Sequence, residues 1–356
     1  MTQPTVKITQ LGLDVGDSYT HFCALDEARQ VLERGRFRTT PEALRQTLGA
    51  RPATRVVLEA GSQSPWMSAA LRELGHQVLV ADPRRVELIA KGHRKTDRRD
   101  AEVLARLATG MPELLGEVHH RSSQEQAALA LLRSRDLLVR MRTKCVQHVR
   151  GTCKAFGLRL RSCSAASFHR AVVETLPEEL RPALEPILMT LKGLQGQIRE
   201  LEERLAALAK DRYPAALMLQ AVNGVGPITS MAFTLTVADP KRFRRSRDVG
   251  SWVGLCPRVR ASGDLDPELS ISKTGDGYLR RLLVQSAQYI LGPFARDSDL
   301  RRFGLRLAER GGKRAKRRAV VAVARKLAVL LHRLWVGGEI YEPLRNARQR
   351  ETLAGL

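Results

Sequence analysis

The sequence predicts an α/β domain at the N-terminus, followed by a mainly helical remainder. Residues 6–110 alternate between short runs of β-branched and aliphatic residues and segments with helical periodicity. From residue 122 onward, apolar residues recur at steps of three and four over long stretches, as amphipathic helices require. The length of 356 residues allows two or three cores, at roughly 100 to 200 residues per domain.

The N-terminal domain, residues 1–121, is expected to run strand, strand, helix, strand, helix, strand. The strands are VKITQLGLDVG, YTHFCALD, RVVLEAG and HQVLVADP, each bounded by Gly, Asp or Pro. The helices are PEALRQTLGA and SPWMSAALRELG, which open at Pro or Ser and end near Gly. This order predicts a sheet with helical cover, whose last helices extend as far as about residue 160.

The first strand carries Asp14, and Gly16 follows it before the second strand begins. A hairpin of this kind opens two classes of ribonuclease-H-like domain. In sugar kinases and related ATPases the aspartate and glycine serve a nucleotide phosphate, whereas in nucleases and recombinases the aspartate holds a divalent metal ion. A kinase of this fold needs a second Gly-rich phosphate turn and an adenosine pocket late in the chain, and neither is found in the sequence. The metal-binding interpretation of Asp14 is therefore favoured.

Residues 122–213 are expected to form a helical, coiled-coil-like region. The first half, SSQEQAALALLRSRDLLVRMRTKCVQHVRGTCKAFG, predicts one long amphipathic helix. In the second half, Leu or Ile recurs at coiled-coil spacing, at Leu184, Ile187, Leu191, Leu194, Ile198, Leu201, Leu205 and Leu208. Two interpretations stay open here, an intramolecular helical hairpin and a dimerisation arm.

Residues 214–356 are expected to form a third, mainly helical domain. The turn NGVG between two helices is typical of a helix-hairpin-helix, in which glycines allow close approach and helix amides face a phosphate. A polar Gly/Ser-bearing loop then leads into the helix that contains LLVQSAQYIL. The stretch AVVAVARKLAVLLHRLW is interrupted by Arg325 and Lys326, so it predicts a core helix rather than a membrane span.

The charge balance indicates a polyanionic partner. The chain has 60 Lys and Arg against 37 Asp and Glu, a net charge of +23. From Arg212 to the end there are 27 Lys and Arg and 12 Asp and Glu, so this part carries +15. Nucleic acid is the usual partner of so basic a chain, although a solvated, solubilising surface is the alternative. With 4% aromatic residues, backbone contacts are expected rather than base stacking.

The cysteines and the N-terminus indicate a cytoplasmic protein, associated with the nucleoid. The five cysteines contain no CxxC pair and no metal-type spacing with His, which favours reduced thiols. The N-terminus MTQPTVKITQ lacks the apolar core of a signal peptide. We expect no membrane association.

Four carboxylates suggest a two-metal site. Asp14 and Glu59 belong to strands, and Asp97 and Asp100 open a helix that Thr96 is placed to cap. The i, i+3 spacing of the last two puts both on one helix face. Together the four acids could hold two Mg²⁺ ions, or Mn²⁺ in their place, roughly 3.5–4 Å apart for phosphoryl transfer. Taken singly, each acid also has an ordinary explanation as a turn, surface or helix-start residue.

The order of these acids, with KTDRRDAEVLA around the last pair, resembles the DEDD transposases of the insertion-sequence-110 family. The stretch VNGVGPITSMAFTLTVADPKRFRRSRDVGSWVGLCPRVRASGD, followed by ISKTGDGYLRRLLVQSA, is similar to that family's C-terminal transposase domain. The resemblance covers nearly the whole chain. It implies a RuvC-like first domain in which the four acids are metal ligands.

The resemblance also implies the reaction and the partners. It implies a recombinase that acts on donor and target DNA, guided by a structured bridge RNA that pairs with both. A serine of the transposase domain is the nucleophile, working with the metal site of another protomer in a homodimer or homotetramer. Delegation of sequence choice to RNA agrees with the low aromatic content.

Ser262 is the preferred nucleophile among the candidate serines. It precedes Gly263 in a polar loop, and Arg258 and Arg260 just before it could clamp a phosphate. Its Ser-Gly after GLxPR also matches the family's position. Ser272 and Ser286 remain as alternatives, the first as a cap for a helix beginning near Lys273 and the second as a small buried hydroxyl.

Basic clusters and glycines complete the expected site. The clusters are Lys241 to Arg247 and Lys313 to Arg318. The candidate nucleic-acid-binding residues are Gly224, Gly226, Lys241, Arg242, Arg244, Arg245, Arg258, Arg260, Lys273, Arg280 and Arg281. The alternative enzyme is a hydrolytic RuvC-like junction resolvase or nuclease that uses water instead of serine. The alternative outside enzymes is a nucleic-acid-binding protein with a relict site.

Overall fold

The computed structural model describes residues 8–89, 97–258 and 269–346; the side chains of residues 97 and 98 are also outside the description. The chain divides into two compact units, Met1–Ser122 and Ser123–Leu356. The first unit is mixed α/β and the second is mainly helical, which confirms the predicted α/β N-terminal domain and the helical remainder. Each unit is described by itself.

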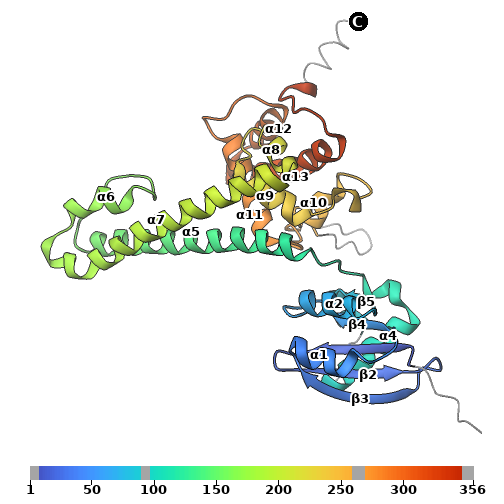
Figure 1. Ribbon diagram of the computed structural model, residues 1–356. Helices are drawn as coiled ribbons and strands as arrows, with labels where there is room; N and C mark the ends of the chain where they lie inside the picture. Colours follow the sequence, from blue (N-terminus) through green and yellow to red (C-terminus); the bar gives the residue numbers. More distant parts are fainter. Residues whose placement is uncertain (1–7, 90–96, 259–268, 347–356) are drawn as a thin grey trace, which may run out of the picture. The chain divides into compact units, whose positions relative to one another are not determined.

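The first unit is built on a five-stranded sheet with the order β3-β2-β1-β4-β5. Its strands are β1 Gln10–Val15, β2 Tyr19–Leu25, β3 Val31–Arg38, β4 Arg55–Glu59 and β5 Gln77–Ala81. The first three strands pair antiparallel, whereas β1 with β4 and β4 with β5 pair parallel. The sheet is drawn in blue in Figure 1.

Strand β3 was not expected from the sequence. It lies at the edge of the sheet and pairs with β2 alone. Among its residues only Phe37 is buried, and four of the eight are charged, as befits an edge strand. The apolar alternation that reveals a central strand is therefore absent here.

Helices cover both faces of the sheet. Their bounds are α1 Pro41–Leu48, α2 Ser64–Glu73, α3 Pro83–Ile89 and α4 Asp97–Gly110, followed by a 3-10 turn at Pro112–Leu115. Side chains of α1 and α2 share a core with Leu11 and Leu13 of β1. Side chains of α4 pack instead with Cys23 of β2 and Val57 of β4. Because strand side chains alternate, even-numbered residues of β1 face α4.

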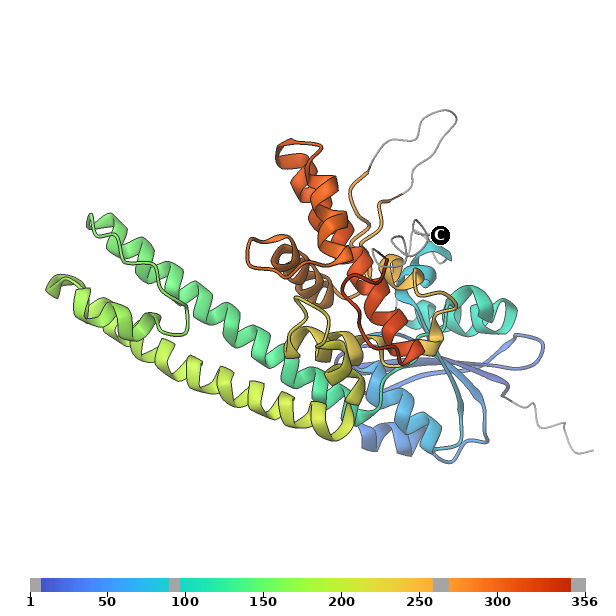
Figure 2. The same ribbon diagram turned by 90° about the horizontal axis from the view of Figure 1, so that it is seen from above.

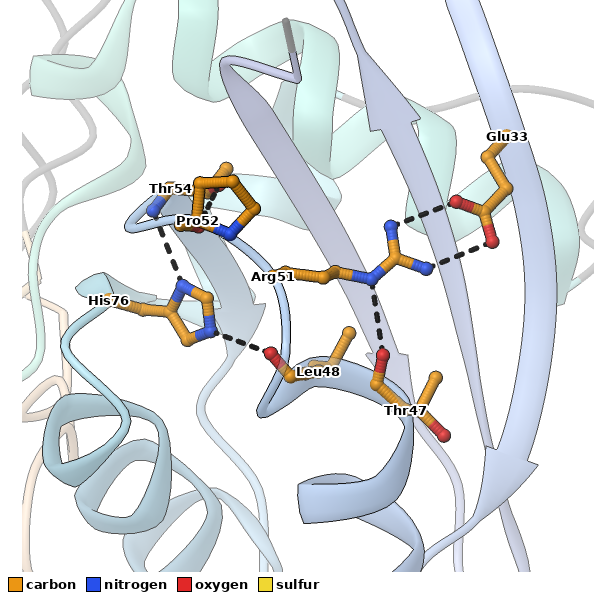
Figure 3. Close-up of polar contacts among 7 residues, drawn as sticks. All are labelled: Glu33, Thr47, Leu48, Arg51, Pro52, Thr54 and His76. Atoms are coloured by element: carbon orange, nitrogen blue, oxygen red, sulfur yellow. Dashed lines mark hydrogen bonds and ion pairs between the residues drawn. The ribbon is translucent and has the colours of Figure 1, made fainter.

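The link between α1 and β4 is fixed by two polar side chains (Figure 3). The buried imidazole of His76 accepts from the Thr54 backbone N–H at 3.3 Å through Nδ1 and donates to the Leu48 carbonyl at 3.4 Å through Nε2. Arg51 donates two hydrogen bonds, of 2.8 and 2.9 Å, to the carboxylate of Glu33 on β3. Arg51, in the segment that follows α1, thus ties β3 to this part of the unit, although β3 buries only one residue.

The second unit begins with a long antiparallel helical hairpin, α5 Ser123–Ala155 and α7 Arg181–Arg212, with the short helix α6 Phe168–Val172 near its tip (Figure 1). The predicted coiled-coil positions Leu184, Leu191, Leu194, Ile198 and Leu205 are buried. The intramolecular hairpin expected as one interpretation is therefore observed.

The hairpin has polar cross-links and two separate cores. Arg142 of α5 donates to Gln195 of α7 at 2.6 Å, and Arg135 pairs with Glu202. Near the tip, a cluster around Phe168 joins α6 to both long helices. At the base, residues of both helices enter the main core of the second unit.

That main core is formed by the remaining helices, α8 Pro214–Leu219, α9 Pro227–Val237, α10 Asp248–Trp252, α11 Gly277–Leu291, α12 Asp299–Ala308 and α13 Gly312–Gly337. Every residue of α9 from Thr229 to Val237 is buried, so this helix is central. The expected core helix with Arg325 and Lys326 is α13, and Figure 2 shows it from above in red.

Two further expectations can be compared with the described residues. All five cysteines are unpaired, in agreement with reduced thiols. Within residues 8–89, 97–258 and 269–346, no helix combines enough length with enough apolar character to span a bilayer.

Candidate functional site

Asp14 and Glu59 emerge from neighbouring parallel strands on the same face of the sheet. Leu13 of β1 and Leu58 of β4 are the last residues that pair with each other. Asp14 and Glu59 are the next residues of the same two strands. Leu13 and Leu58 belong to the core beneath α1 and α2, so the following residue on each strand points to the opposite face, toward α4. Neighbouring strands lie about 4.8 Å apart, and the two half-buried carboxylates are thus near neighbours.

The N-terminal turn of α4 lies at the same edge of the sheet. At its other end, a Cβ built on Gly110 would be 3.6 Å from Nη1 of Arg29, in the turn between β2 and β3. That turn is beside the start of β1. The helix therefore runs antiparallel to β1, and its first turn, with Asp97 and Asp100, points toward the Asp14 end.

A glycine in β1 allows α4 to approach the sheet at backbone distance. A Cβ built on Gly12 would lie 2.0 Å from the Ala101 carbonyl oxygen and 2.7 Å from the Ala105 nitrogen. Both obstacles are backbone atoms, so no side-chain movement would relieve the contact. Gly12 is two residues before Asp14, and Ala101 follows Asp100. The close approach thus sets the distance between the helix acids and the strand acids. This role was not predicted from the sequence, although a glycine inside an apolar strand can indicate a close backbone approach.

An ion-pair network holds α4 against the edge strand. Glu102 accepts a 2.6 Å hydrogen bond from Arg34 of β3 and a 2.9 Å hydrogen bond from Arg106. The hydrogen bond from Arg34 holds the pKa of the Glu102 carboxyl below its usual value, with Arg106 adding to the effect. Because Glu102 is two residues after Asp100, this network restrains rotation of the helix next to the acids.

The donor set suits Mg²⁺ in chemistry, because carboxylate oxygens are its preferred protein ligands. Among the side chains that the structure describes, however, no three of the His, Cys, Asp and Glu type are close enough together to hold a metal ion. The side chain of Asp97 lies outside that description. The structure thus brings Asp14 and Glu59 to one face and directs the first turn of α4 to the same edge, without a described three-residue metal cluster.

His21 is a further neighbour of the acids that was not predicted from the sequence. It lies directly opposite Asp14 in the antiparallel pairing of β1 and β2, and it is half-buried. Directly opposed residues of such a pair share one face of the sheet. No motif in the sequence points to this histidine, because the pairing register of the two strands is needed to find it.

The segments before and after the preferred serine in the sequence pair with each other. Arg258 N–H donates to the Ser270 carbonyl at 3.1 Å, and Ser272 N–H donates to the Cys256 carbonyl at 2.9 Å. Residues 254–258 and 270–274 therefore run antiparallel. Ser262 and Arg260 fall on residues 259–268, outside the described residues.

The structure changes the interpretation of Ser272 and agrees with that of Ser286. The helix after the loop begins at Gly277, and the Asp276 carboxylate caps it by accepting from the Leu279 N–H at 2.8 Å. The expected cap by Ser272 is therefore wrong; its hydroxyl lies 3.0 Å from that of Thr274. Ser286 is buried in α11, as a small core hydroxyl would be.

The basic loop, defined as residues 240–247, is held from within by α13. The buried His332 donates from Nε2 to the Pro240 carbonyl at 2.8 Å, while its Nδ1 lies 3.0 Å from the Ser246 hydroxyl. One imidazole thus bonds both ends of the loop. Phe243 packs edge-on against His332 and Trp252, with centroid distances of 5.4 and 5.3 Å.

The outer side chains of the basic loop are exposed cations, Lys241, Arg242, Arg244, Arg245 and Arg247. The guanidinium of Arg242 lies 4.9 Å from the Phe243 ring centroid and 4.7 Å from that of Trp252. The packing of Phe243 against His332 and Trp252 anchors the loop, and its exposed cations make it a suitable surface for a phosphate backbone.

The other candidate nucleic-acid-binding residues divide between exposed and internal roles. Gly226 is exposed at the start of α9, with nothing within 4 Å of an added Cβ, whereas an added Cβ at Gly224 would meet Ile290 of α11 at 2.9 Å. Arg280 donates to the Val253 and Thr274 carbonyls, and Arg281 binds both oxygens of Asp136 at 2.7 Å. Lys273 is exposed, with a left-handed backbone at φ 57°.

Comparison with known proteins adds independent information. Residues 11–156 match a family model of DEDD transposases, described as a transposase of IS110 type. Residues 216–303 match a second model, described as the transposase IS116/IS110/IS902 family. The two matches cover the acid-bearing unit and the segment that flanks the preferred serine.

Three curated relatives agree with these matches. A probable family 20 transposase of Pseudomonas aeruginosa is 30% identical over 95% of this chain and 100% of its own length. The transposase for insertion sequence element IS1111A of Coxiella burnetii is 29% identical over 93% of this chain and 90% of its own. The transposase for insertion sequence element IS1328 of Yersinia enterocolitica is 33% identical over 79% of this chain and 83% of its own. The chain belongs to the IS110 family of transposases.

Proposed function

We propose that this transposase cleaves and rejoins DNA through a RuvC-like, metal-dependent carboxylate site and a serine nucleophile, guided by a bridge RNA. The metal ligands in this proposal are Asp14, Glu59, Asp97 and Asp100, and the nucleophile is Ser262. The strongest support is the shared face of Asp14 and Glu59, with the first turn of α4 at the same edge. The sheet order, three antiparallel strands followed by two parallel ones, supports the RuvC-like assignment.

Two Mg²⁺ ions bound by the acids would supply charge stabilisation for the attacking and leaving oxygens of the phosphodiester. The protein's part is to hold four carboxylates at one edge. Gly12 allows the short distance between α4 and β1, and the hydrogen bond from Arg34 to Glu102 restrains rotation of α4 about its axis. Asp97, whose side chain lies outside the described residues, would supply a further carboxylate from the first turn of α4.

In the proposed reaction, Oγ of Ser262 forms a bond to the scissile phosphorus while one phosphorus–sugar oxygen bond breaks. The sugar leaves as a hydroxyl and takes up the proton that the serine loses. Attack by a hydroxyl of the exchanged strand reverses the step and restores the serine. The antiparallel pairing at Arg258 and Ser270 supports a fixed position for the ends of this segment, and Arg258 is suited to contact the phosphate.

Strand exchange between donor and target DNA, with Mg²⁺ and copurified RNA present, tests the proposal. Asp14→Asn and Ser262→Ala should each abolish exchange, and only proteins with the serine should give an SDS-resistant protein–DNA adduct. Ser286→Ala is the matched control, because its hydroxyl is buried in α11. If Ser262→Ala still cleaves DNA while Asp14→Asn does not, the enzyme is a hydrolytic resolvase. Normal exchange by both variants rejects the site altogether.

RNA guidance and assembly need measurements of their own. RNA that copurifies with the active protein should map to DNA flanking its gene, and its removal should stop exchange. An active preparation without RNA would reject guidance. Light scattering of the protein–DNA complex should give the mass of a homodimer or homotetramer, and an active monomer would reject assembly in trans.

A further inference from the structure

A cavity of about 470 Å³ lies between α12, α13 and residues 341–346 of the second unit. Its volume falls within the roughly 300–1,000 Å³ of small-molecule pockets. One face of α13 forms a wall, because Ala322, Lys326, Val329 and Arg333 follow at helical spacing. Figure 1 shows the two helices together in the orange and red part of the chain.

The charge of the lining favours an anion. Arg247, Arg325 and Lys326 line the cavity and form no ion pair with another described residue. Arg333 lies 3.7 Å from the carboxylate of Glu339, which also pairs with Arg345.

Two acids, Asp299 and Glu342, also line the cavity, and the carboxylate of Asp299 already accepts a hydrogen bond. The Asp299 carboxylate accepts the Asn346 backbone N–H at 2.8 Å, and the Asp299 N–H donates to the Pro343 carbonyl at 2.7 Å. Asp299 thereby fastens residues 341–346 over α12. Glu342 is exposed at the rim, and the cations outnumber the acids.

Part of the cavity lining is apolar. Leu300, Phe303, Val329 and Leu330 contribute to it. The ammonium of Lys326 lies 3.9 Å from the centroid of the Phe303 ring. The ammonium covers this face of the ring, so a base that stacks there displaces Lys326 from the ring toward the phosphate of the same nucleotide.

The cavity is continuous with the basic loop. Arg247 ends that loop and also lines the cavity. Arg325 packs on the start of α10, where its Cγ would lie 3.0 Å from a Cβ built on Gly250. A strand that follows the cations of the loop would therefore reach the mouth of the cavity.

We propose that this cavity binds one unstacked nucleotide of the nucleic acid that the transposase handles. The phosphate is held by Arg247, Arg325 and Lys326, and the base lies on Phe303 and Leu330. The inference rests on the proposed function only in assuming that nucleic acid follows the basic loop. DNA and RNA share this chemistry, and the probes below separate them.

Fluorescence anisotropy of the full-length protein in EDTA measures binding without cleavage. The probes are labelled ten-residue strands of dT, of rU and of abasic deoxyribose phosphate, which carry equal charge. The wild-type protein should prefer a base-carrying strand over the abasic one by roughly five- to tenfold, as stacking of one base allows. Whichever of dT and rU gains more identifies the source of the nucleotide.

Two variants localise the preference. Ala322→Trp fills the cavity but keeps every cation, so it should remove the preference for a base while abasic binding stays within about twofold of wild type. Arg325→Ser with Lys326→Ser should weaken all three probes by roughly tenfold through lost phosphate contacts. Lys192→Ser with Lys210→Ser removes the same charge from exposed positions on α7 and should change binding by less than about twofold.

Equal binding of base-carrying and abasic strands by the wild-type protein would overturn the proposal. So would a full base preference in the Ala322→Trp protein. The catalytic proposal is tested by a separate measurement, Mg²⁺-dependent strand exchange. It fails if the Asp14→Asn protein still exchanges strands. Binding in EDTA does not depend on that result.

Discussion

The acid-bearing edge of the first unit and the basic loop of the second are held in place by different means. At the acid edge, strand pairing and a backbone contact at Gly12 set the positions of the functional groups. At the basic loop, one buried side chain, His332, bonds both ends of an irregular segment 86 and 92 residues away. Several backbone and side-chain contacts thus position the acid edge, whereas the basic loop depends on a single buried side chain.

The largest expected effect is a break at the backbone contact. Gly12→Val should push α4 away from β1, since the added atoms would collide with the Ala101 carbonyl. We expect the first unit to lose about 1–3 kcal/mol or more of unfolding free energy, as overpacking typically costs. Strand exchange should fall with it. Hydrogen exchange of residues 97–110 and denaturant unfolding measure the two effects.

Gly61→Ala is the control for this change, because nothing lies within 4 Å of an added Cβ there. Its unfolding free energy should stay close to that of the wild-type protein. Unchanged protection of α4 in Gly12→Val would contradict a backbone-limited distance between helix and sheet.

The second break is at the buried imidazole. His332→Phe keeps an aromatic ring against Phe243 but leaves the Pro240 carbonyl and the Ser246 hydroxyl without this partner. Both of these residues are half-buried, so the loss of two hydrogen bonds should destabilise the second unit by about 1–2 kcal/mol. Affinity for a short DNA duplex should fall severalfold as the loop loses its position.

His148→Phe, at an exposed position on α5, supplies the matched substitution and should change neither quantity. Loss of stability without any loss of DNA affinity would show that His332 supports the core but does not position the loop.

A third change sharpens the comparison with a buried polar group that lacks such bonds. The Tyr278 hydroxyl is buried without a hydrogen-bond partner among the described residues, and burial, reinforced by Asp136, raises its pKa to about 12. Tyr278→Phe should therefore be neutral or stabilise the second unit by up to about 1 kcal/mol. Thermal unfolding at pH 7 decides, and clear destabilisation would mean that the hydroxyl is bonded.

The smallest effect is expected at His120 in the first unit, whose Nε2 lies 2.9 Å from the Ser64 hydroxyl. Burial lowers its pKa from the usual 6.5, and Arg72 and Arg121 contribute. The unfolded chain thus takes up this proton first as the pH falls below 6.5, and folding stability falls with it. His120→Gln should flatten the pH dependence of unfolding between pH 6.5 and 5. An unchanged slope would contradict the shift.

The sequence predicted those strands and helices whose apolar residues recur at regular spacing. Strands β1, β2, β4 and β5 and the two long helices followed from alternation and helical spacing. Edge strand β3 was missed because only Phe37 is buried. The start of α11 was placed near Lys273 rather than at Gly277, since two polar residues, Ser272 and Asp276, could each cap it and only the fold selects between them.

The candidate site divides in the same way. The residue types predicted that Asp14 and Glu59 belong to strands, whereas their shared face depends on the pairing of β1 with β4. Three other features depend on which segments meet in the folded chain. They are the contact of α4 with β1, the position of His21 opposite Asp14, and the hydrogen bonds of His332 to the basic loop. A cavity whose lining residues range from Arg247 to Asn346 likewise has no recognisable sequence motif.

The α5–α7 hairpin behaves as a spacer with an independent anchor at each end. The cluster around Phe168 secures its tip, and the main core secures its base. Removing seven residues from the middle of both helices would draw the tip inward by about 10 Å while leaving the two ends packed. The length of the hairpin can therefore be changed while the packing at both of its ends is kept.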